Sequence, residues 1–497
     1  MASPGVLCCS TIEVTAWRCQ YGIGGRLKFK PTGIFEYLTA VMLVLAFALA
    51  GWKTFTRLPA ASFMVETRLP EQSPEASARS PDPVKKPPAS APKPSQRSAD
   101  GHFMLDAQFV SSTPGQAVHA ASMVELSNGN LRAVWFSGSK EGARDVKVQT
   151  AVMDAATLQW DAESTIFERH QIERGLWRYV KKVGNPVIAR APDGALWLWM
   201  VNVSLGGWAG SAITWSRSTD EGISWSQPRR LVTSPFLNIS TLVKGAPFAL
   251  ADGQIALPVY HEFITKLGEI LRIDAQGRVV DKVRIPGSQT SLQPVVLVTG
   301  SESADVYMRS GNAKALMAST TDDAGKTWST TRTTSWPNPD ASVAGVVTRS
   351  GVQWLALNPT TNHRQILALL RAESRTESRP DKKGHFEGAS QWIIESSATP
   401  VTRLSVEDYE RVLGRELAAS GVAQSQVSAY VASAKRQLCG PQSCWLEFSY
   451  PHLLQSRDGY LHLIYTWHRT RIKHIRLDPL QSAPTVQPTV AHVPPTH

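Results

Sequence analysis

The chain has 497 residues and a formal net charge of +11 at pH 7, so its length allows either several domains or one large repeat protein. Much of the positive charge lies in the N-terminal segments, and neither a basic helix nor an RNA-binding signature accompanies it. A solvated basic segment accounts for this pattern, and we therefore expect no nucleic-acid partner.

The N-terminal region combines a basic segment, residues 1–33, with an uncharged stretch at residues 37–52. We predict a transmembrane helix or signal anchor at residues 34–52, which leaves the N-terminus in the cytoplasm and exports the bulk of the chain. The predicted location is thus membrane-anchored, with the bulk periplasmic or extracellular. Secretion after signal cleavage is the alternative, because Ala48-Leu49-Ala50 resembles a cleavage site.

Two further segments lack the large apolar residues that a core needs. Residues 53–102 are rich in Pro, Ser and Lys, and we predict a linker without stable structure there. Residues 478–497 have a similar composition, which predicts a disordered tail. Cys439 and Cys444 lie in the region between these segments, where an exported protein could join them as a disulfide; two free thiols or a metal pair are the alternatives.

Residues 103–477 alternate short apolar runs with turn residues, which is an all-β pattern. One turn-strand unit recurs in it, in which a glycine, often in Asp-Gly or Asn-Gly, precedes β-branched and aromatic residues. The copies are spaced by roughly 50–65 residues, the length of one four-stranded propeller blade. The turn glycines of the six copies are Gly129, Gly194, Gly253, Gly300 (in a weaker copy), Gly351 and Gly459.

The interval between the last two copies is about twice as long as the others, and it contains a helical pattern. Within residues 404–437, Val406, Tyr409, Val412 and Leu413 recur at helical spacing. We therefore predict one or two helices inserted before the last blade.

A second repeat is more specific. Two stretches, Ser218 to Trp225 and Thr321 to Trp328, share the pattern S/T-x-D-x-G-x-T/S-W. The aspartate suits a turn whose amides it caps, the glycine permits an unusual φ, and the tryptophan packs beneath the blade. The pattern resembles the Asp-box of sialidases and related propellers. Together with the six units, it makes residues 103–477 resemble a sialidase-type six-bladed β-propeller of the BNR-repeat kind.

The resemblance implies a retaining glycosidase whose tyrosine nucleophile is paired with a glutamate and whose arginines hold the substrate carboxylate. Tyr450 matches the tyrosine that opens the last blade. Arg309, on a strand that leads into an Asp-box, matches one arginine, and Arg364, after Asn358-Pro359, matches another. The forked guanidinium group suits a carboxylate clamp.

Two positions depart from the family pattern. His119 stands where the family has its first arginine, and Gln293 stands where it has the glutamate that activates the tyrosine. A glutamine cannot take a proton, and an ordinary phenol is a poor nucleophile without one or without nearby cations. Both residues remain candidates for substrate binding.

The family's general acid/base lies on a loop after an inner strand of the first blade, and two carboxylates match that place. Glu141 lies at the tip of this loop and is the preferred candidate, whereas Asp145 precedes the next strand and could cap it. Three other residues are expected to face the same cleft and could supply a base, namely His261, Glu262 and His452.

These residues favour a sialidase-like glycosidase that hydrolyses a terminal acidic sugar, without a metal or other cofactor. The predicted partners are an acidic glycan and, through the N-terminal segment, a membrane. Two alternatives remain at this level. One is a hydrolase or lyase of uronic-acid polysaccharide, with Tyr450 and His452 or His261 as the lyase pair. The other is a carbohydrate-binding propeller without turnover, which the changes at His119 and Gln293 favour.

Overall fold

The computed structural model describes residues 34–55, 61–65, 106–234, 238–372, 386–396 and 403–479. They divide into two compact units, residues 1–58 and residues 59–497. The basic segment at residues 1–33, most of the predicted linker and nearly all of the predicted tail lie outside the described residues.

The described part of the first unit is one helix, α1 (Ile34–Phe55). It covers the stretch for which a helix was predicted. Among the helices that the structure describes, none combines the length and the apolar character needed to cross a membrane. The predicted transmembrane helix at residues 34–52 is therefore not supported.

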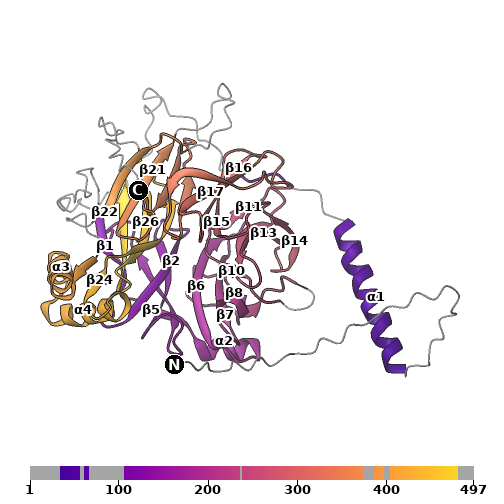
Figure 1. Ribbon diagram of the computed structural model, residues 1–497, viewed down its shortest axis with the longest axis horizontal. Coiled ribbons are helices and arrows are strands. Elements are labelled where there is room, and N and C mark those ends of the chain that lie inside the picture. The colour runs from indigo at the N-terminus through magenta and orange to yellow at the C-terminus, as the bar shows by residue number, and fades with distance from the viewer. Residues whose placement is uncertain are drawn as a thin grey trace, which may run out of the picture. The chain divides into compact units, whose positions relative to one another are not determined.

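The described strands of the second unit form a six-bladed β-propeller (Figure 1). Each blade is an antiparallel sheet whose strands follow one another from the axis outward. Blade 1 is β2 (Ala117–Glu125), β3 (Leu131–Gly138), β4 (Lys147–Met153) and β5 (Ser164–Glu168); blade 2 is β6 (Lys182–Arg190), β7 (Leu196–Val203), β8 (Ser211–Ser218) and β9 (Arg229–Arg230); blade 3 is β10 (Leu242–Val243), β12 (Ile255–His261), β13 (Leu267–Ile273) and β14 (Val279–Arg284), with β11 (Phe248–Ala249) also pairing with β12.

The remaining blades complete the ring. Blade 4 is β15 (Ser291–Val298), β16 (Ala304–Ser310), β17 (Ala315–Thr321) and β18 (Arg332–Pro337); blade 5 is β19 (Ala344–Val347), β20 (Gln353–Leu357), β21 (Ile366–Ala372) and β22 (Ser390–Ser396); blade 6 is β25 (Phe448–Gln455), β26 (Leu461–Trp467), β27 (Arg471–Leu477) and β1 (Asp106–Phe109).

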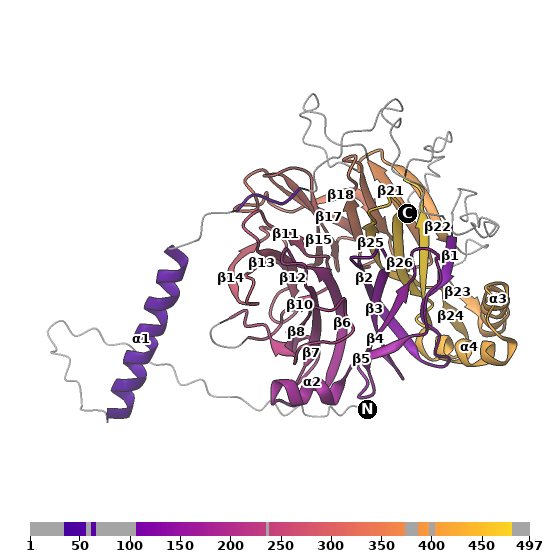
Figure 2. The ribbon, with the colours of Figure 1, turned by 180° about the vertical axis from the view of Figure 1, so that it is seen from behind.

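Blade 6 closes the ring with strands from both ends of the propeller sequence. Its outer strand β1 pairs antiparallel with β27, from Asp106 opposite Arg476 to Phe109 opposite Lys473. At the centre, β2 of blade 1 contacts β25 of blade 6 as well as β6 of blade 2. Figures 1 and 2 show β2, β6 and β15 in the middle of the molecule and β1, β14 and β22 toward its rim.

The six predicted turn-strand units occupy equivalent places, because each turn joins the first two hydrogen-bonded strands of a blade. Gly129, for example, lies between β2 and β3, and Gly459 lies between β25 and β26. Both have positive φ, 89° and 95°, which glycine adopts without steric cost. The strands that follow are buried along their whole length, so the predicted repeat is confirmed.

The two Asp-boxes form almost the same hydrogen-bonded turn. In the second box, Asp323 accepts hydrogen bonds from the backbone and hydroxyl of Thr327, and Gly325 donates to the Thr321 hydroxyl. Asp220 bonds to Ser224 in the same way in the first box. Trp328 is buried beneath its turn, so these motifs stabilise the rim of the blades.

The predicted helical insertion is present between blades 5 and 6. It consists of α3 (Val406–Ala419) and α4 (Gln424–Leu438), flanked by the paired strands β23 (Arg403–Ser405) and β24 (Ser443–Trp445). The buried face of the helices belongs to the same apolar cluster as blades 5 and 6. Cys439 and Cys444 form a disulfide at the end of α4. This confirms the predicted disulfide over two free thiols or a metal pair.

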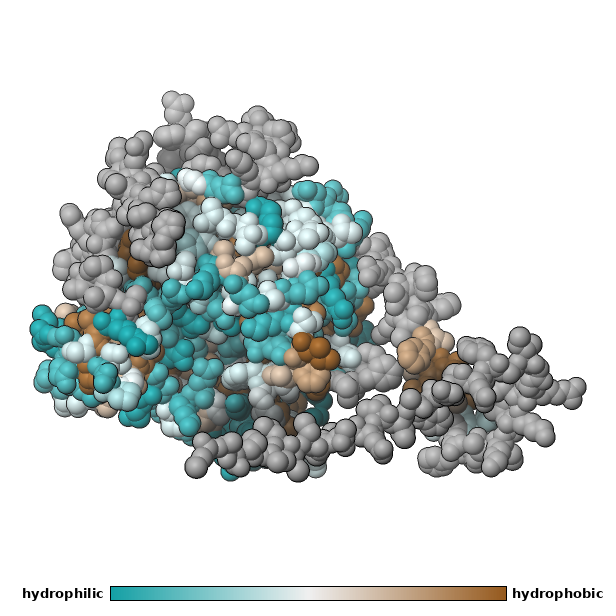
Figure 3. Space-filling view, viewed as in Figure 1, coloured by the Kyte–Doolittle hydropathy of each residue, from teal (hydrophilic) through white to brown (hydrophobic). Residues whose placement is uncertain are grey.

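Two smaller features complete the fold. The helix α2 (Arg169–Leu176) follows β5 and begins with a capping box between Glu168 and Gln171. Residues 61–65, which fall within the predicted linker, contact the propeller: Phe63 is buried and its backbone N–H donates to Ser301. The visible face of the propeller is mostly hydrophilic (Figure 3).

Candidate active site

Four of the six inner strands carry a β-bulge at the same level of the ring. In β2, β6, β15 and β25 the pairing register shifts, and one residue of each bulge has a left-handed backbone. These residues are Ala120 (φ 56°), Asn185 (φ 40°), Gln293 (φ 56°) and Tyr450 (φ 53°). A bulge redirects a side chain out of the alternating pattern of a strand. The bulges bring Gln293 and Tyr450, 157 residues apart, into contact.

The Tyr450 hydroxyl receives two hydrogen bonds. Gln293 Nε2 donates to its oxygen at 3.2 Å, and Arg309 Nη1 donates at 3.3 Å. Arg309 Nη1 also lies 3.2 Å from Gln293 Oε1. Because a guanidinium group can only donate, the amide oxygen must face Arg309 and the amide nitrogen must face Tyr450. Two donors therefore converge on the phenol oxygen, an arrangement that favours negative charge on it.

A second tyrosine lies behind this pair. Tyr260 Oη accepts hydrogen bonds from Gln293 Nε2 at 3.3 Å and from Asn185 Nδ2 at 3.2 Å. Burial raises the pKa of Tyr260 well above its ordinary value, so this phenol keeps its proton. Tyr260 and Asn185 thereby fix the amide of Gln293 in place.

Three guanidinium groups surround Tyr450. Arg309 forms an ion pair with Asp340, with 2.9 Å between Nε and Oδ1. The guanidinium carbon of Arg364 lies 5.8 Å from the centroid of the Tyr450 ring. Arg469, from the turn between β26 and β27, shares the carboxylate of Glu447 with Arg364.

Glu447 is the buried anion that holds Arg364 and Arg469 together. Its Oε1 lies 3.3 Å from Arg364 Nη1 and 3.0 Å from Arg469 Nε, and it also accepts a hydrogen bond from Ser449. Burial opposes its negative charge, but the two guanidinium groups outweigh burial and hold the pKa of Glu447 far below its usual range. The pair of arginines is thus fixed by a carboxylate that stays ionised.

His119 packs against the ring of Tyr450, with 4.1 Å between the ring centroids. Its Nδ1 is 3.1 Å from the hydroxyl oxygen of Thr466. Burial and the nearby charge of Arg469 lower the pKa of His119 well below its ordinary value. At neutral pH the imidazole is therefore uncharged and can accept or donate a hydrogen bond, but it does not add a fourth cation.

The arrangement combines a phenol oxygen in contact with donors and three guanidinium groups that carry further N–H donors. Such groups suit a ligand with a carboxylate, because guanidinium binds carboxylates with paired hydrogen bonds. A family model for the BNR repeat-like domain matches residues 129–463. The chain belongs to this BNR repeat-like family.

Solved structures with the same fold include several sialidases. The BNR repeat-like protein is similar to NanB sialidase from Streptococcus pneumoniae, with a TM-score of 0.52 and 10% identity over 75% of this chain and 70% of that one. It is also similar to the intramolecular trans-sialidase from Ruminococcus gnavus, with a TM-score of 0.54 and 11% identity over 78% and 98%. A third similar structure is a Hadza microbial sialidase, with a TM-score of 0.53 and 13% identity over 73% of this chain and 66% of that one.

The BNR repeat-like protein thus spans just under two thirds of the Hadza enzyme. At these identities the structural likeness shows the fold alone. Among curated protein sequences there is no match.

Five of the predicted site residues meet in the centre of the BNR repeat-like protein. Tyr450, Arg309 and Gln293 are joined by hydrogen bonds, and Arg364 and His119 pack against the Tyr450 ring.

The predicted acid/base residues lie in three different surroundings. Glu141 is 3.4 Å from Arg469 and so belongs to the edge of the cluster. Asp145 accepts two hydrogen bonds from Ser139, both at 2.9 Å, and so caps its own turn. Glu262 is partly buried, and burial raises its pKa although Arg309 acts in the opposite direction.

The two other histidines do not join the cluster through any contact within the described residues. His261 pairs with the buried Glu269 at 3.0 Å. His452 lines a small cavity together with Lys244.

Three residues that form ion pairs around Tyr450 were not predicted: Arg469, Glu447 and Asp340. Glu447 directly precedes the strand that carries Tyr450. A single carboxylate at the start of a buried strand could have indicated a buried ion pair there. Arg469 lies in a tight turn with positive φ, where a charged residue looks like an ordinary solvated turn residue. Asp340 also has positive φ and lies outside any repeat of the sequence.

Proposed function

We propose that the protein is a sialidase-type glycosidase that hydrolyses the bond to a terminal acidic sugar and retains the anomeric configuration. The proposal rests on one observation: the Tyr450 oxygen accepts hydrogen bonds from Arg309 and Gln293 while two further guanidinium groups surround it. A nucleophile and a carboxylate-binding group thus share one site.

In the proposed mechanism, Arg309, Arg364 and Arg469 bind the carboxylate of the sugar. The Tyr450 oxygen attacks the anomeric carbon, the bond to the leaving oxygen breaks, and a covalent glycosyl-tyrosine forms. A water molecule then attacks the same carbon and releases the sugar and Tyr450. Because Gln293 cannot accept a proton, the phenol proton passes to water as Tyr450 attacks, and Arg309 and Gln293 donate to the phenol oxygen.

The leaving oxygen needs a proton, and two carboxylates can supply it. Glu141 contacts Arg469 at the edge of the cluster. Glu262 has a raised pKa because it is buried, which suits a general acid near neutral pH. Glu141→Gln and Glu262→Gln separate them, since loss of the acid slows substrates with poor leaving groups and spares those with activated aryl leaving groups.

Turnover of aryl sialosides and aryl uronides tests the proposal. Tyr450→Phe is expected to lower kcat on the accepted substrate by at least about 1000-fold, and the exposed Tyr179→Phe is the matched control. A fluorinated glycosyl fluoride of the accepted sugar should label Tyr450 covalently in mass spectrometry. A folded protein that binds acidic oligosaccharides but cleaves neither substrate class would overturn hydrolysis in favour of binding alone.

A lyase is not favoured, because neither histidine considered for it forms a hydrogen bond with Tyr450 among the described residues. His452 lines a small cavity with Lys244, and His261 pairs with Glu269. An unsaturated product that absorbs in the near ultraviolet would reverse this conclusion.

We also propose that the propeller acts outside the cytoplasm. The Cys439–Cys444 disulfide supports this location, because disulfides persist mainly in oxidising compartments. Localisation of an epitope-tagged chain by protease protection of intact cells tests it.

A further inference from the structure

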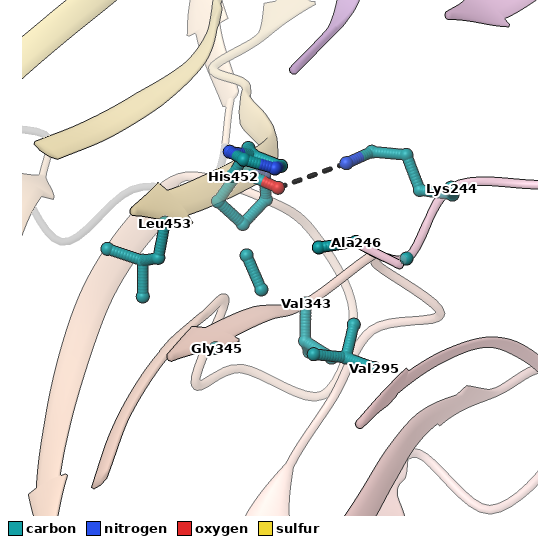
Figure 4. A pocket seen from close by; sticks show the side chains of 10 residues that line it. Lys244, Ala246, Val295, Val343, Gly345, His452 and Leu453 are labelled. Atoms are coloured by element: carbon teal, nitrogen blue, oxygen red, sulfur yellow. Dashed lines mark hydrogen bonds between the residues drawn. The ribbon is translucent and has the colours of Figure 1, made fainter. Parts of the chain in front are cut away.

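A cavity of about 10 Å³ lies between the inner strands of blades 3 to 6, and Pro451, the residue after Tyr450, contributes to its lining. Lys244 borders it on one side and His452 on the other, and Val295 and Gly345 contribute to its wall (Figure 4). A cavity of this size has room for about one water-sized occupant. None of the catalytic steps proposed above uses these residues.

Lys244 is a buried cation without an acidic partner among the described residues. Its side chain is 2% exposed, and its Nζ donates to the carbonyl oxygen of Pro451 at 3.1 Å. No carboxylate in the described part of the chain forms an ion pair with it. A carbonyl accepts a hydrogen bond but does not neutralise charge, and a buried ammonium is costly unless an anion compensates it.

His452 supplies a second polar group at the same cavity. It is 5% exposed, and its Nδ1 is buried without a hydrogen-bond partner among the described residues. A buried polar atom without a partner in a native protein points to a bound water or ion. In the tautomer with a proton on Nδ1, this atom donates a hydrogen bond, as Lys244 does.

We propose that this cavity is a binding site for a small monovalent anion, a halide such as chloride, held by Lys244 and His452. Both residues line the cavity, one of them with a cationic donor, and no carboxylate of the described residues forms an ion pair with Lys244. This inference does not depend on the proposed function.

The titratable groups around Lys244 give the site a defined pH dependence. Burial lowers the pKa of Lys244 to about 7 and that of His452 to about 3. Tyr450 and His119 also face Lys244, and the pKa of His119 is lowered by burial as well. Both imidazoles are therefore neutral near pH 7, and the charge of the site is that of Lys244. Anion binding should be strong below pH 7 and weaken as pH rises through that value.

Thermal unfolding in sodium chloride and sodium gluconate at equal ionic strength tests the proposal. At pH 6, chloride at about 0.5 M should raise Tm by about 2–5 °C over gluconate, because a ligand that binds only the folded state stabilises it. At pH 9 the difference should fall below about 1 °C. Lys244→Met should abolish the effect, and the exposed Lys326→Met should keep it. Equal stabilisation of both variants would overturn the site.

A crystal of the unmodified protein grown at pH 6 and soaked in bromide provides the second measurement. We expect an anomalous peak between Lys244 Nζ and His452 Nδ1. Density for a water molecule alone, without an anomalous signal, would overturn the proposal even if Lys244→Met did not fold.

Discussion

Gln293 determines what Tyr450 can do at the centre of the propeller. Its amide donates to the phenol oxygens of Tyr450 and Tyr260 and accepts from Arg309. A glutamate at this position would accept a proton from the phenol, whereas the amide can only stabilise a charge that already exists. In the proposed mechanism, Gln293 therefore supports charge on the Tyr450 oxygen and does not remove its proton.

The first prediction concerns this amide. Gln293→Leu removes one of the two donors to the Tyr450 oxygen, and the loss of such a donor costs about 100-fold in kcat with little change in KM. Steady-state kinetics on the accepted aryl glycoside measures both constants. Gln149→Leu, a buried glutamine in blade 1, is the matched control. An unchanged kcat in folded Gln293→Leu would contradict the role assigned to the amide.

The second prediction concerns Glu447 and pH. Its pKa is depressed in the folded protein, so its contribution to stability is present above the unfolded pKa of about 4.3. That contribution declines as pH falls below the unfolded pKa, and it is gone once pH has passed the lower, folded value. Glu447→Gln leaves Arg364 and Arg469 without their carboxylate and should lower the free energy of unfolding by about 3 kcal/mol at pH 7.

Chemical denaturation of both proteins between pH 3 and pH 8 measures this effect. The difference between them should be constant from pH 5 to pH 8 and should shrink below pH 4. Glu410→Gln, which removes an exposed partner of Lys435, should change stability by less than about 1 kcal/mol. A difference that grows toward low pH would contradict the assignment.

At the scale of single elements, the Asp-box turns serve the rim and not the site. Asp323 binds only groups of its own turn within the described contacts. Asp323→Ala should therefore lower Tm by about 2–4 °C, which corresponds to roughly 1 kcal/mol in a protein of this size, and leave kcat unchanged. Lys326→Ala, in the same turn, is the control. A fall in kcat would show that the turn communicates with the centre.

The sequence predicted these elements better than it predicted the side chains between them. The glycine turns and Asp-boxes depend on local chemistry, so their positions can be read from a few neighbouring residues. The four bulges cannot. Ala120, Gln293 and Tyr450 are of types that rarely adopt a left-handed backbone, and although asparagine is enriched there, most asparagines do not adopt it, so Asn185 could not be predicted either. Arg469 was missed for the same reason, since only the assembled ring shows that its turn faces Glu447.

At the scale of the whole molecule, β1 joins the two ends of the propeller sequence in one sheet. The test compares two truncated variants, one beginning at Asp106 and the other at Val110, which differ only in the presence of β1. The shorter one exposes the edge of β27 and removes Phe109 from Trp467. We expect it to have a Tm at least about 10 °C lower, or to aggregate. Circular dichroism and size-exclusion chromatography measure this, and equal stability of the two chains would contradict the closure.

The number of blades could be predicted by counting the sequence repeats. The pairing of β1 with β27 that closes the ring could not. Residues 106–109 carry no turn glycine and no Asp-box, and their pairing with β27 spans almost the entire propeller sequence. Contacts between such distant segments depend on global geometry. The convergence of Arg309, Arg364 and Tyr450 was expected from the family resemblance, and the acidic residues that orient them were not.

The left-handed backbone at the four bulges places stability and activity in opposition at specific residues. A non-glycine residue in this conformation costs on the order of 1 kcal/mol or more, so glycine would relieve strain at each position. At Ala120 the exchange removes only a methyl group, and selection for heat resistance could accept it. At Gln293 and Tyr450 the same exchange would remove the amide and the phenol on which the proposed mechanism depends, so relief of strain there would come at the expense of the proposed activity.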